Sequence, residues 1–214
     1  QSDPLCLALL GDLLVTSYFL GYEEVTVLDR IESLARKAVA LDPRCQHAQL
    51  LMAMIYFARL QKEKFLEAAK KALRLNPNNA GFSAALAMHL WMAGERKQGM
   101  ELMASAMDLN PQHPGWYHIL PLLHSYKHFD YETALSKALD FNSQGVYLDP
   151  LFRAAVYGKL GAHEKATKAA KELLDIFPDF NSTGKNILKR FFLLDEDVEM
   201  LWEGLMAVIT SEVN

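Results

Sequence analysis

Apolar and polar residues alternate along most of the chain with the spacing of amphipathic helices, and prolines interrupt this pattern at a regular interval. The segments ARKAVALDP, AKKALRLNP and ASAMDLNP end at Pro43, Pro77 and Pro111, so one helix-ending segment returns every 34 residues. Each period holds two helical stripes, and Gly94 and Gly161 mark the break between the two in their periods. Strand patterns are nearly absent. The sequence therefore predicts helix pairs, each closed by a proline that cannot continue a helix.

The period is irregular in the first and fourth repeats. A further segment, KELLDIFP, ends at Pro178, which is 67 residues after Pro111 and leaves room for one irregular repeat from 114 to about 142. The first repeat has extra residues around 21–28, where we expect a longer loop between its helices. The LDP at 148–150 is out of phase, and we expect it to begin a helix. About five helix pairs are predicted.

Beyond Pro178 the chain leaves the 34-residue phase but keeps helical spacing. From Asp195, which we expect to cap a helix, apolar residues recur three and four positions apart. They are Val198, Leu201, Trp202, Leu205, Met206 and Ile209. A helix of this kind must bury one face. We therefore predict a repeat array over residues 1–180 and C-terminal helices over 181–214 that cap it, with self-association through this face as the alternative.

Small residues accompany the 34-residue period. Alanines recur at its eighth position as Ala53, Ala87 and Ala154, and at its twenty-seventh as Ala38, Ala72 and Ala106. A helix–turn–helix unit of 34 residues with this pattern resembles the tetratricopeptide repeat (TPR) family. The resemblance implies an all-α, right-handed α-solenoid of about five TPR-like helix pairs. Two residues at the twentieth position, Phe65 and Gly99, depart from the pattern, and we expect their helix pairs to be splayed or shifted.

Several shorter segments resemble a narrower group of repeat domains. They are NPNNAG, HPGWY, QGVYLDP and WEGL. Together they are similar to the C-terminal TPR domains of bacterial multidomain signalling proteins, such as those linked to adenylate cyclase or winged-helix regulator domains. The chain also opens without a methionine or a signal segment. We therefore expect it to be the C-terminal part of a cytoplasmic bacterial regulator.

In TPR arrays the first helix of each pair lines a concave surface. Carried over to this sequence, the resemblance implies a partner-binding face made of Met54, Phe57, Met88, Trp91, Trp116, Ile119, Tyr126 and Lys127. Most of these residues are apolar rather than the Lys, Arg and Asn that grip a terminal carboxylate, so we expect an apolar, helical or extended partner segment. The alternative is that neighbouring helices bury the same residues as core.

Composition narrows the choice of partner. The chain of 214 residues has a net charge of −4, with 22 basic and 26 acidic side chains, which gives no reason to expect nucleic acid or an anionic membrane. No apolar run reaches the length of a membrane span. The two cysteines, Cys6 and Cys45, match no disulfide or zinc pattern and are interpreted as small buried residues in a reducing compartment.

Catalytic and metal-binding motifs are missing from the sequence. His124 and His128 are spaced to bind one metal ion, but two further ligands are lacking nearby, so we expect neither a metal nor a cofactor. The favoured function is a non-catalytic protein–protein interaction or scaffolding module, with homo-oligomerisation possible. The alternative is a small-ligand sensor or enzyme with a pocket in the concave face, where only His47, Lys127 and Lys159 are ionisable.

Overall fold

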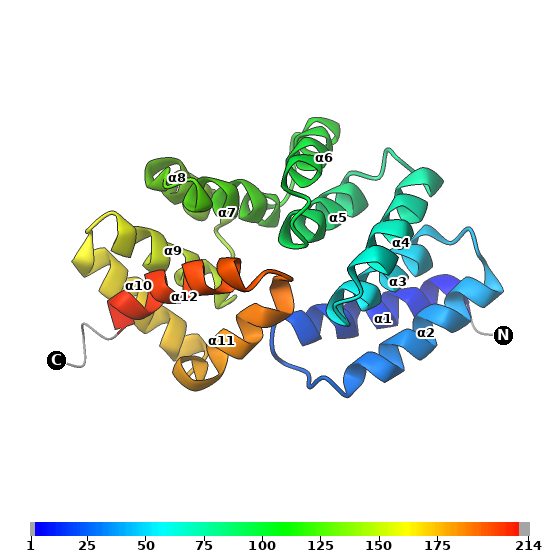
Figure 1. The fold of residues 1–214 in the computed structure, drawn as a ribbon, viewed down its shortest axis with the longest axis horizontal. Helices are drawn as coiled ribbons and strands as arrows, with labels where there is room; N and C mark the ends of the chain where they lie inside the picture. Colours follow the sequence, from blue (N-terminus) through cyan, green and yellow to red (C-terminus); the bar gives the residue numbers. More distant parts are fainter. Residues whose placement is uncertain (1–2, 210–214) are drawn as a thin grey trace. The chain divides into compact units, whose positions relative to one another are not determined.

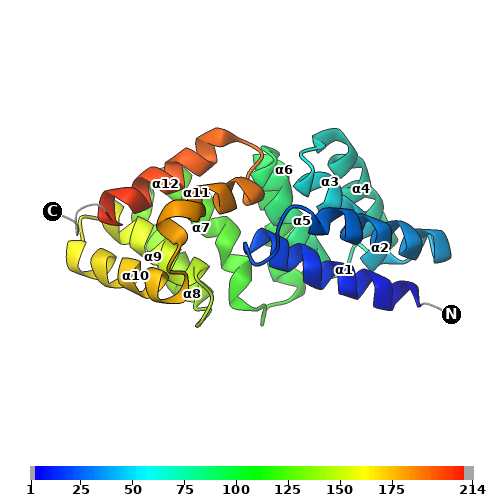
Figure 2. The same ribbon diagram turned by 90° about the horizontal axis from the view of Figure 1, so that it is seen from below.

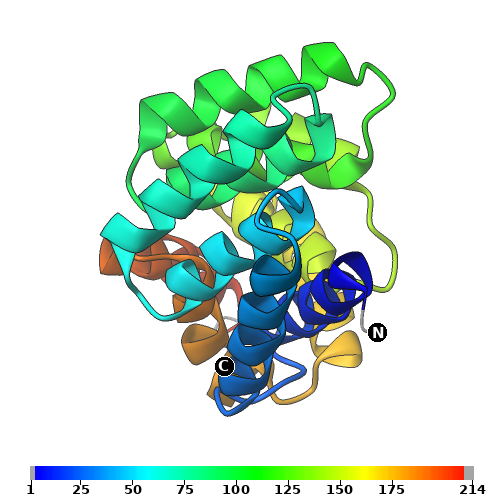
Figure 3. The same ribbon diagram turned by 90° about the vertical axis from the view of Figure 1, so that its right-hand side faces the viewer.

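The structure is a computed structural model that describes residues 3–209 (Figure 1). Within those residues it contains helices and no strand, and the chain divides into two compact units, Gln1–Leu109 and Asn110–Asn214. The helices of the first unit are α1 (Pro4–Phe19), α2 (Val27–Leu41), α3 (Gln46–Ala58), α4 (Lys62–Leu75), α5 (Ala80–Met92) and α6 (Arg96–Leu109). They form the pairs α1–α2, α3–α4 and α5–α6, and Figure 3 shows these pairs from the N-terminal side.

The second unit begins with a short 3-10 helix. Its elements are η1 (Gly115–His118), α7 (Ile119–Lys127), α8 (Tyr131–Phe141), α9 (Leu148–Lys159), α10 (His163–Ile176), α11 (Phe180–Phe191) and α12 (Asp195–Ile209). The pairs α7–α8 and α9–α10 bring the number of helix pairs in residues 3–209 to five, as predicted. The expected helix start at 148–150 is confirmed by α9, and the expected long first loop lies between α1 and α2.

The prolines and glycines act as the sequence predicted. Helices α2, α4, α6 and α10 each end two residues before Pro43, Pro77, Pro111 or Pro178. The turns within pairs use a left-handed residue, with φ of 91° at Gly94 and 70° at Gly161, where the missing Cβ avoids a steric penalty. Asp195 lies one position later than expected, because it is the first residue of α12 rather than its cap.

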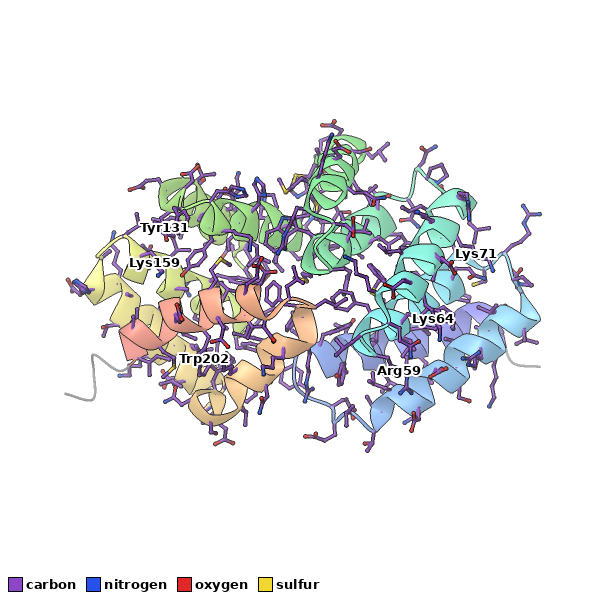
Figure 4. The ribbon with its side chains drawn as sticks, viewed as in Figure 1. Arg59, Lys64, Lys71, Tyr131, Lys159 and Trp202 are labelled. Carbon is purple, nitrogen blue, oxygen red and sulfur yellow. The ribbon has the colours of Figure 1, made fainter. Side chains whose placement is uncertain are left out.

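The alanines in phase with the period lie where helices touch. Ala38, Ala53, Ala72, Ala87, Ala106 and Ala154 are all fully buried. Their small side chains allow two helix backbones to approach closely, which explains why the period keeps a small residue at these places. Polar contacts tie the pairs together at their edges: Arg59, at the end of α3, lies 2.5 Å from an oxygen of Asp29 and 3.0 Å from one of Glu32, both on α2 (Figure 4).

The expectation that Phe65 and Gly99 splay their helix pairs is wrong. Phe65 is fully buried in the α3–α4 pair and packs edge-on against Phe57, with ring centroids 5.3 Å apart. At Gly99 a Cβ atom would lie only 2.8 Å from the carbonyl oxygen of Ala87, so the missing side chain brings α6 directly against α5. Phe65 fills the space between α3 and α4, and Gly99 allows α5 and α6 to pack closely.

The cysteines also differ from expectation. Cys6 is exposed on α1 and Cys45 is only partly buried, and neither forms a disulfide. Cys6 lies on a side of α1 that the packing of the first unit leaves uncovered. The prediction that both cysteines are buried apolar residues is therefore wrong.

Candidate partner-binding surfaces

The predicted residues of the first unit lie on α3 and α5, the first helices of their pairs. Met54, Phe57 and Trp91 are buried, and Met88 is half-buried. Within the unit, Phe57 is covered by rings of its own chain: its centroid lies 5.9 Å from that of Phe19 and 4.8 Å from that of His89. Phe57 is therefore part of the core of the first unit, which was the alternative to a role in partner binding.

His89 is a buried polar group within this aromatic cluster. Its Nδ1 lies 2.7 Å from the carbonyl oxygen of Ala85, and because a carbonyl only accepts, Nδ1 carries the proton and donates. Burial lowers the pKa of His89 from 6.5 to about 4, since the cluster offers the charged ring little solvation, while the hydrogen bond to Ala85 raises the pKa by a smaller amount. His89 is therefore neutral at physiological pH.

Trp91 lies at the end of α5 and is held by Arg96. The guanidinium carbon of Arg96 is 3.9 Å from the centroid of the indole, and Nη1 donates a hydrogen bond of 2.6 Å to the carbonyl oxygen of Trp91. The arginine thus combines a cation–π contact with a cap for the last turn of α5. Arg96 covers one face of the ring that was predicted to contact a partner.

An exposed apolar face on α1 was missed by the sequence analysis. Leu5, Leu9, Leu10 and Leu13 are 42%, 48%, 40% and 65% exposed, and Cys6 lies on the same side of the helix. The opposite side of α1 is buried, as Ala8, Val15 and Phe19 show. The signal in the sequence was a helix with almost no polar face, because Asp12 is the only charged residue in α1.

The predicted residues of the second unit lie on η1 and α7. Trp116 is half-buried, Ile119 and Tyr126 are buried, and Lys127 retains a quarter of its side-chain exposure. Helix α12 covers the last two: Nζ of Lys127 lies 2.7 Å from Oε1 of Glu196 and 2.8 Å from Oδ1 of Asp197. In this unit, part of the predicted surface is occupied by the chain itself.

Helix α12 packs along α9 and also touches α10 and α11 (Figures 1 and 2). The predicted apolar face is largely buried, since Val198, Leu201, Leu205 and Ile209 are all covered. Trp202 and Met206 are half-buried, and Trp202 points toward α11, with its ring centroid 6.2 Å from that of Phe180. Figure 4 shows Trp202 on α12 and Lys159 at the end of α9.

A small pocket in the second unit lies away from all of these residues. It has a volume of about 300 Å³ and lies between the loop at 143–145, the start of α9 and helix α10. Arg153 lines it and is held by two carboxylates, those of Asp149 and Glu172, each at 2.7 Å. None of the predicted partner-binding residues lines this pocket.

His124 on α7 and His128 at the end of that helix lie next to each other. The rings of His124 and His128 are 4.3 Å apart, but across residues 3–209 no three His, Cys, Asp or Glu side chains come together as a metal site would need. Over the same residues no helix has both the length and the apolar character required to cross a bilayer.

No protein-family model and no curated protein matches the chain. Solved structures resemble it at low sequence identity. PilW, a widely conserved type IV pilus biogenesis factor, is 16% identical, with a TM-score of 0.62 over 96% of this chain and 90% of that one. Cut9 with Hcn1, an APC/C hetero-tetramer, gives 15% identity and a TM-score of 0.67 over 99% of this chain, which spans only 44% of the matched one.

A third likeness is weaker: YrrB, described as a TPR protein with an unusual peptide-binding site, is 20% identical over 83% of this chain and 88% of that one, with a TM-score of 0.49. At these identities the likenesses concern the fold alone. The likenesses to PilW and Cut9, together with the helix pairs and the buried alanines, define the class as an all-α solenoid of TPR-like pairs, as predicted.

Proposed function

We propose that the chain is a non-catalytic protein–protein interaction module that binds an apolar segment of its partner. The observation that carries the proposal is the exposed face of α1, formed by Leu5, Cys6, Leu9, Leu10 and Leu13 and called the α1 face below. Exposed apolar patches of this kind on a folded protein mark sites of interaction.

The spacing along the helix makes these residues one surface. Leu5, Leu9 and Leu13 follow one another at intervals of four, so they lie above one another on a helix, and Cys6 and Leu10 form the neighbouring row. These five residues carry no charge, and the exposed Asp12 borders them beside Leu9. An apolar helix or extended strand of a partner would bury these leucines at a gain of about 25 cal/mol per Å².

The eight predicted residues remain our proposal for further binding surfaces, one on α3 and α5 of the first unit and one on η1 and α7 of the second. Met88 and Trp116 are half-buried and so are directly accessible to a partner, each within its own unit. Phe57 and Trp91 are not directly accessible to a partner, because side chains of the first unit cover them. The TPR-like fold supports the proposal, since it presents long helical surfaces without needing a catalytic centre.

The alternative function, a sensor or enzyme, finds little support. In the pocket near Arg153, the arginine is paired with Asp149 and Glu172, and none of the residues predicted to bind a partner lines the pocket. We propose further, from the resemblance, that the module belongs to a larger bacterial signalling protein and acts in the cytoplasm, without contacting nucleic acid or a membrane.

The test uses the α1 face directly. Peptides of random sequence are selected for binding to the protein, and their affinity is measured by calorimetry against the wild type and the Leu9→Lys/Leu13→Lys variant. Binding should weaken at least tenfold in the variant, because two lysines interrupt the apolar face. A fluorophore on Cys6, in a Cys45→Ser background, should report the same binding as a change in emission.

The control is a variant that replaces two exposed leucines elsewhere, Leu109→Lys/Leu139→Lys, on α6 and α8. It changes the charge by the same amount, removes a similar exposed apolar area and should bind peptides as the wild type does. If a second copy of the chain occupies the α1 face, sedimentation will show a dimer that only the α1 variant dissociates. Selection of no peptide, together with a monomer at all concentrations, would contradict the proposal.

A further inference from the structure

Helix α12 is attached to α7 and α9 by contacts that resemble those of a bound ligand. At its start, Glu196 and Asp197 both reach Nζ of Lys127, at the end of α7. Asp197 is fully buried and Glu196 is exposed, so one carboxylate is enclosed by the contact and the other stays in water. The α12 helix therefore presents its acidic first turn to a cation on another helix, which fixes its position along α7.

Two turns further along, α12 meets the other helices at a glycine. A Cβ on Gly204 would lie 2.0 Å from the hydroxyl oxygen of Tyr126 and 3.4 Å from Cε of Lys159. On the facing helix, a Cβ on Gly158 would lie 2.6 Å from a methyl carbon of Val208 and 3.5 Å from the carbonyl oxygen of Gly204. Glycine inside a helix lowers stability by about 1 kcal/mol relative to alanine. Gly158 and Gly204 are nevertheless needed here, because a larger side chain at either position would prevent the close approach of α9 and α12.

The contact leaves one polar atom unsatisfied. The hydroxyl of Tyr126 is buried beneath Gly204 and has no hydrogen-bond partner among the described residues. Burying a hydroxyl in this way is unfavourable, and water would solvate it if α12 moved away. The side chain of Lys127, in contrast, is 26% exposed, so water already reaches it. These features lower the cost of removing α12 from the surface.

We propose that α12 is an intramolecular ligand of the surface formed by Tyr126, Lys127, Gly158 and Lys159, and that an external helix of the same chemistry displaces it. This surface selects an amphipathic helix with a carboxylate in its first turn and a glycine seven residues later. In α12 these positions are Asp197 and Gly204, followed by Val208 on the same face. The inference rests on the proposed function in assuming that the chain binds protein segments, but it concerns a different surface from the α1 face.

The test supplies the α12 helix as a separate peptide. A fluorescein-labelled peptide with the sequence of residues 195–209 is added to the full chain, and binding is followed by anisotropy. In the Gly204→Leu chain the bulky side chain meets Tyr126 and releases the chain's own α12, so the peptide should bind at least tenfold more tightly than to the wild type. The matched control is Ala207→Leu, which enlarges an exposed position of the same helix and should bind the peptide as the wild type does.

A charge reversal tests whether the peptide occupies the same surface. Adding Lys127→Glu to the Gly204→Leu chain should reduce peptide binding at least tenfold, and a peptide carrying Asp197→Lys should restore it. Lys137→Glu, which removes a lysine that pairs with Asp140 on α8, is the control and should leave binding unchanged. If Gly204→Leu fails to fold by circular dichroism, Asp197→Lys in the chain replaces it, because two lysines facing each other also release α12.

Several results would overturn the inference. Equal peptide affinity for the wild type, the Gly204→Leu chain and the Ala207→Leu chain would show that α12 does not compete for the surface. Binding that ignores the charge at position 127 would place the peptide elsewhere. Peptide binding to none of the folded chains would mean that α12 is structural. None of these results would alter the behaviour of the Leu9→Lys/Leu13→Lys variant, so failure here is separable from failure of the proposed function.

Discussion

Gly99 lies directly against the backbone of Trp91 where α6 crosses α5. A Cβ at position 99 would come within 2.9 Å of both the backbone nitrogen and the Cβ of Trp91. Contacts this short with backbone atoms cannot be relieved by turning a side chain, so the two helices would have to move apart. The α5–α6 pair therefore depends on the absence of one methyl group.

Replacing Gly99 by alanine should lower the stability of the first unit. The substitution gains about 1 kcal/mol of helix propensity but forces α5 and α6 apart, and we expect a net loss of about 1–2 kcal/mol. The matched control is Gly81→Ala on α5, whose Cβ would meet only an oxygen of Asn79 at an ordinary 3.6 Å. That variant should be neutral or slightly more stable. Thermal unfolding followed by circular dichroism compares the two, and equal melting temperatures would contradict the close crossing.

The buried His89 should make the protein less stable in mild acid. Its pKa is about 4 in the folded chain against an ordinary value of 6.5, so between these two pH values the unfolded chain binds more protons than the folded one. The stabilising contribution is complete above pH 6.5 and is lost as the pH falls toward 4, by up to about 3 kcal/mol. Urea denaturation at a series of pH values measures this slope.

The comparison that isolates His89 uses two variants. His89→Leu removes the titrating group from the aromatic cluster and should flatten the dependence of stability on pH between 6.5 and 4. His163→Leu removes an exposed histidine at the start of α10 and should keep the slope of the wild type. A slope that is unchanged in His89→Leu would mean that other groups cause the loss of stability in acid.

Arg96 should stabilise the end of α5 through both of its contacts with Trp91. Arg96→Ala removes the stacked guanidinium and the hydrogen bond to the carbonyl, and we expect a loss of about 1–2 kcal/mol. In a chain with Trp116 and Trp202 replaced by Phe, the emission of Trp91 should shift to longer wavelength as water reaches the ring. Arg74→Ala, at an exposed position near the end of α4, should change neither quantity.

The sequence was most informative where one residue decides a local feature. Pro43, Pro77, Pro111 and Pro178 located the helix ends because a proline acts on its own turn. The apolar pattern of α12 likewise predicted four of its buried residues, while Trp202 and Met206 on the same pattern are only half-buried. Gly99 was misjudged, because its role depends on a backbone that approaches from another helix.

Longer-range features could not be obtained from the pattern. Helix α1 is apolar on nearly every side, so its periodicity does not indicate which leucines the rest of the unit covers. The place where α12 packs depends on Lys127 and Asp197, which are 70 residues apart, and no local spacing relates them. For the same reason, the candidate surface at Tyr126 could be proposed from the resemblance, but its occupation by α12 could not.

The ion pair between Lys127 and Asp197 should contribute more to stability than the pair of Lys185 and Glu199, which also ends on α12. Lys127→Met leaves a fully buried carboxylate without its lysine and should destabilise the chain by about 2 kcal/mol, reduced from the value of a fully buried pair because Lys127 is partly exposed. In the double variant with Asp197→Asn the loss should be smaller than the sum of the single losses. The difference, about 2 kcal/mol, is the coupling energy from a double-mutant cycle.

The pair of Lys185 and Glu199, which also ends on α12, is the control for this cycle. Its atoms are equally close at 2.7 Å, but both side chains are more than a third exposed. Solvent screens an exposed pair, so the cycle with Lys185→Met and Glu199→Gln should give a coupling energy below about 1 kcal/mol. Raising the salt concentration should reduce that small coupling further and leave most of the coupling between Lys127 and Asp197. Equal coupling energies for the two pairs would mean that burial of Asp197 does not strengthen its contact with α7.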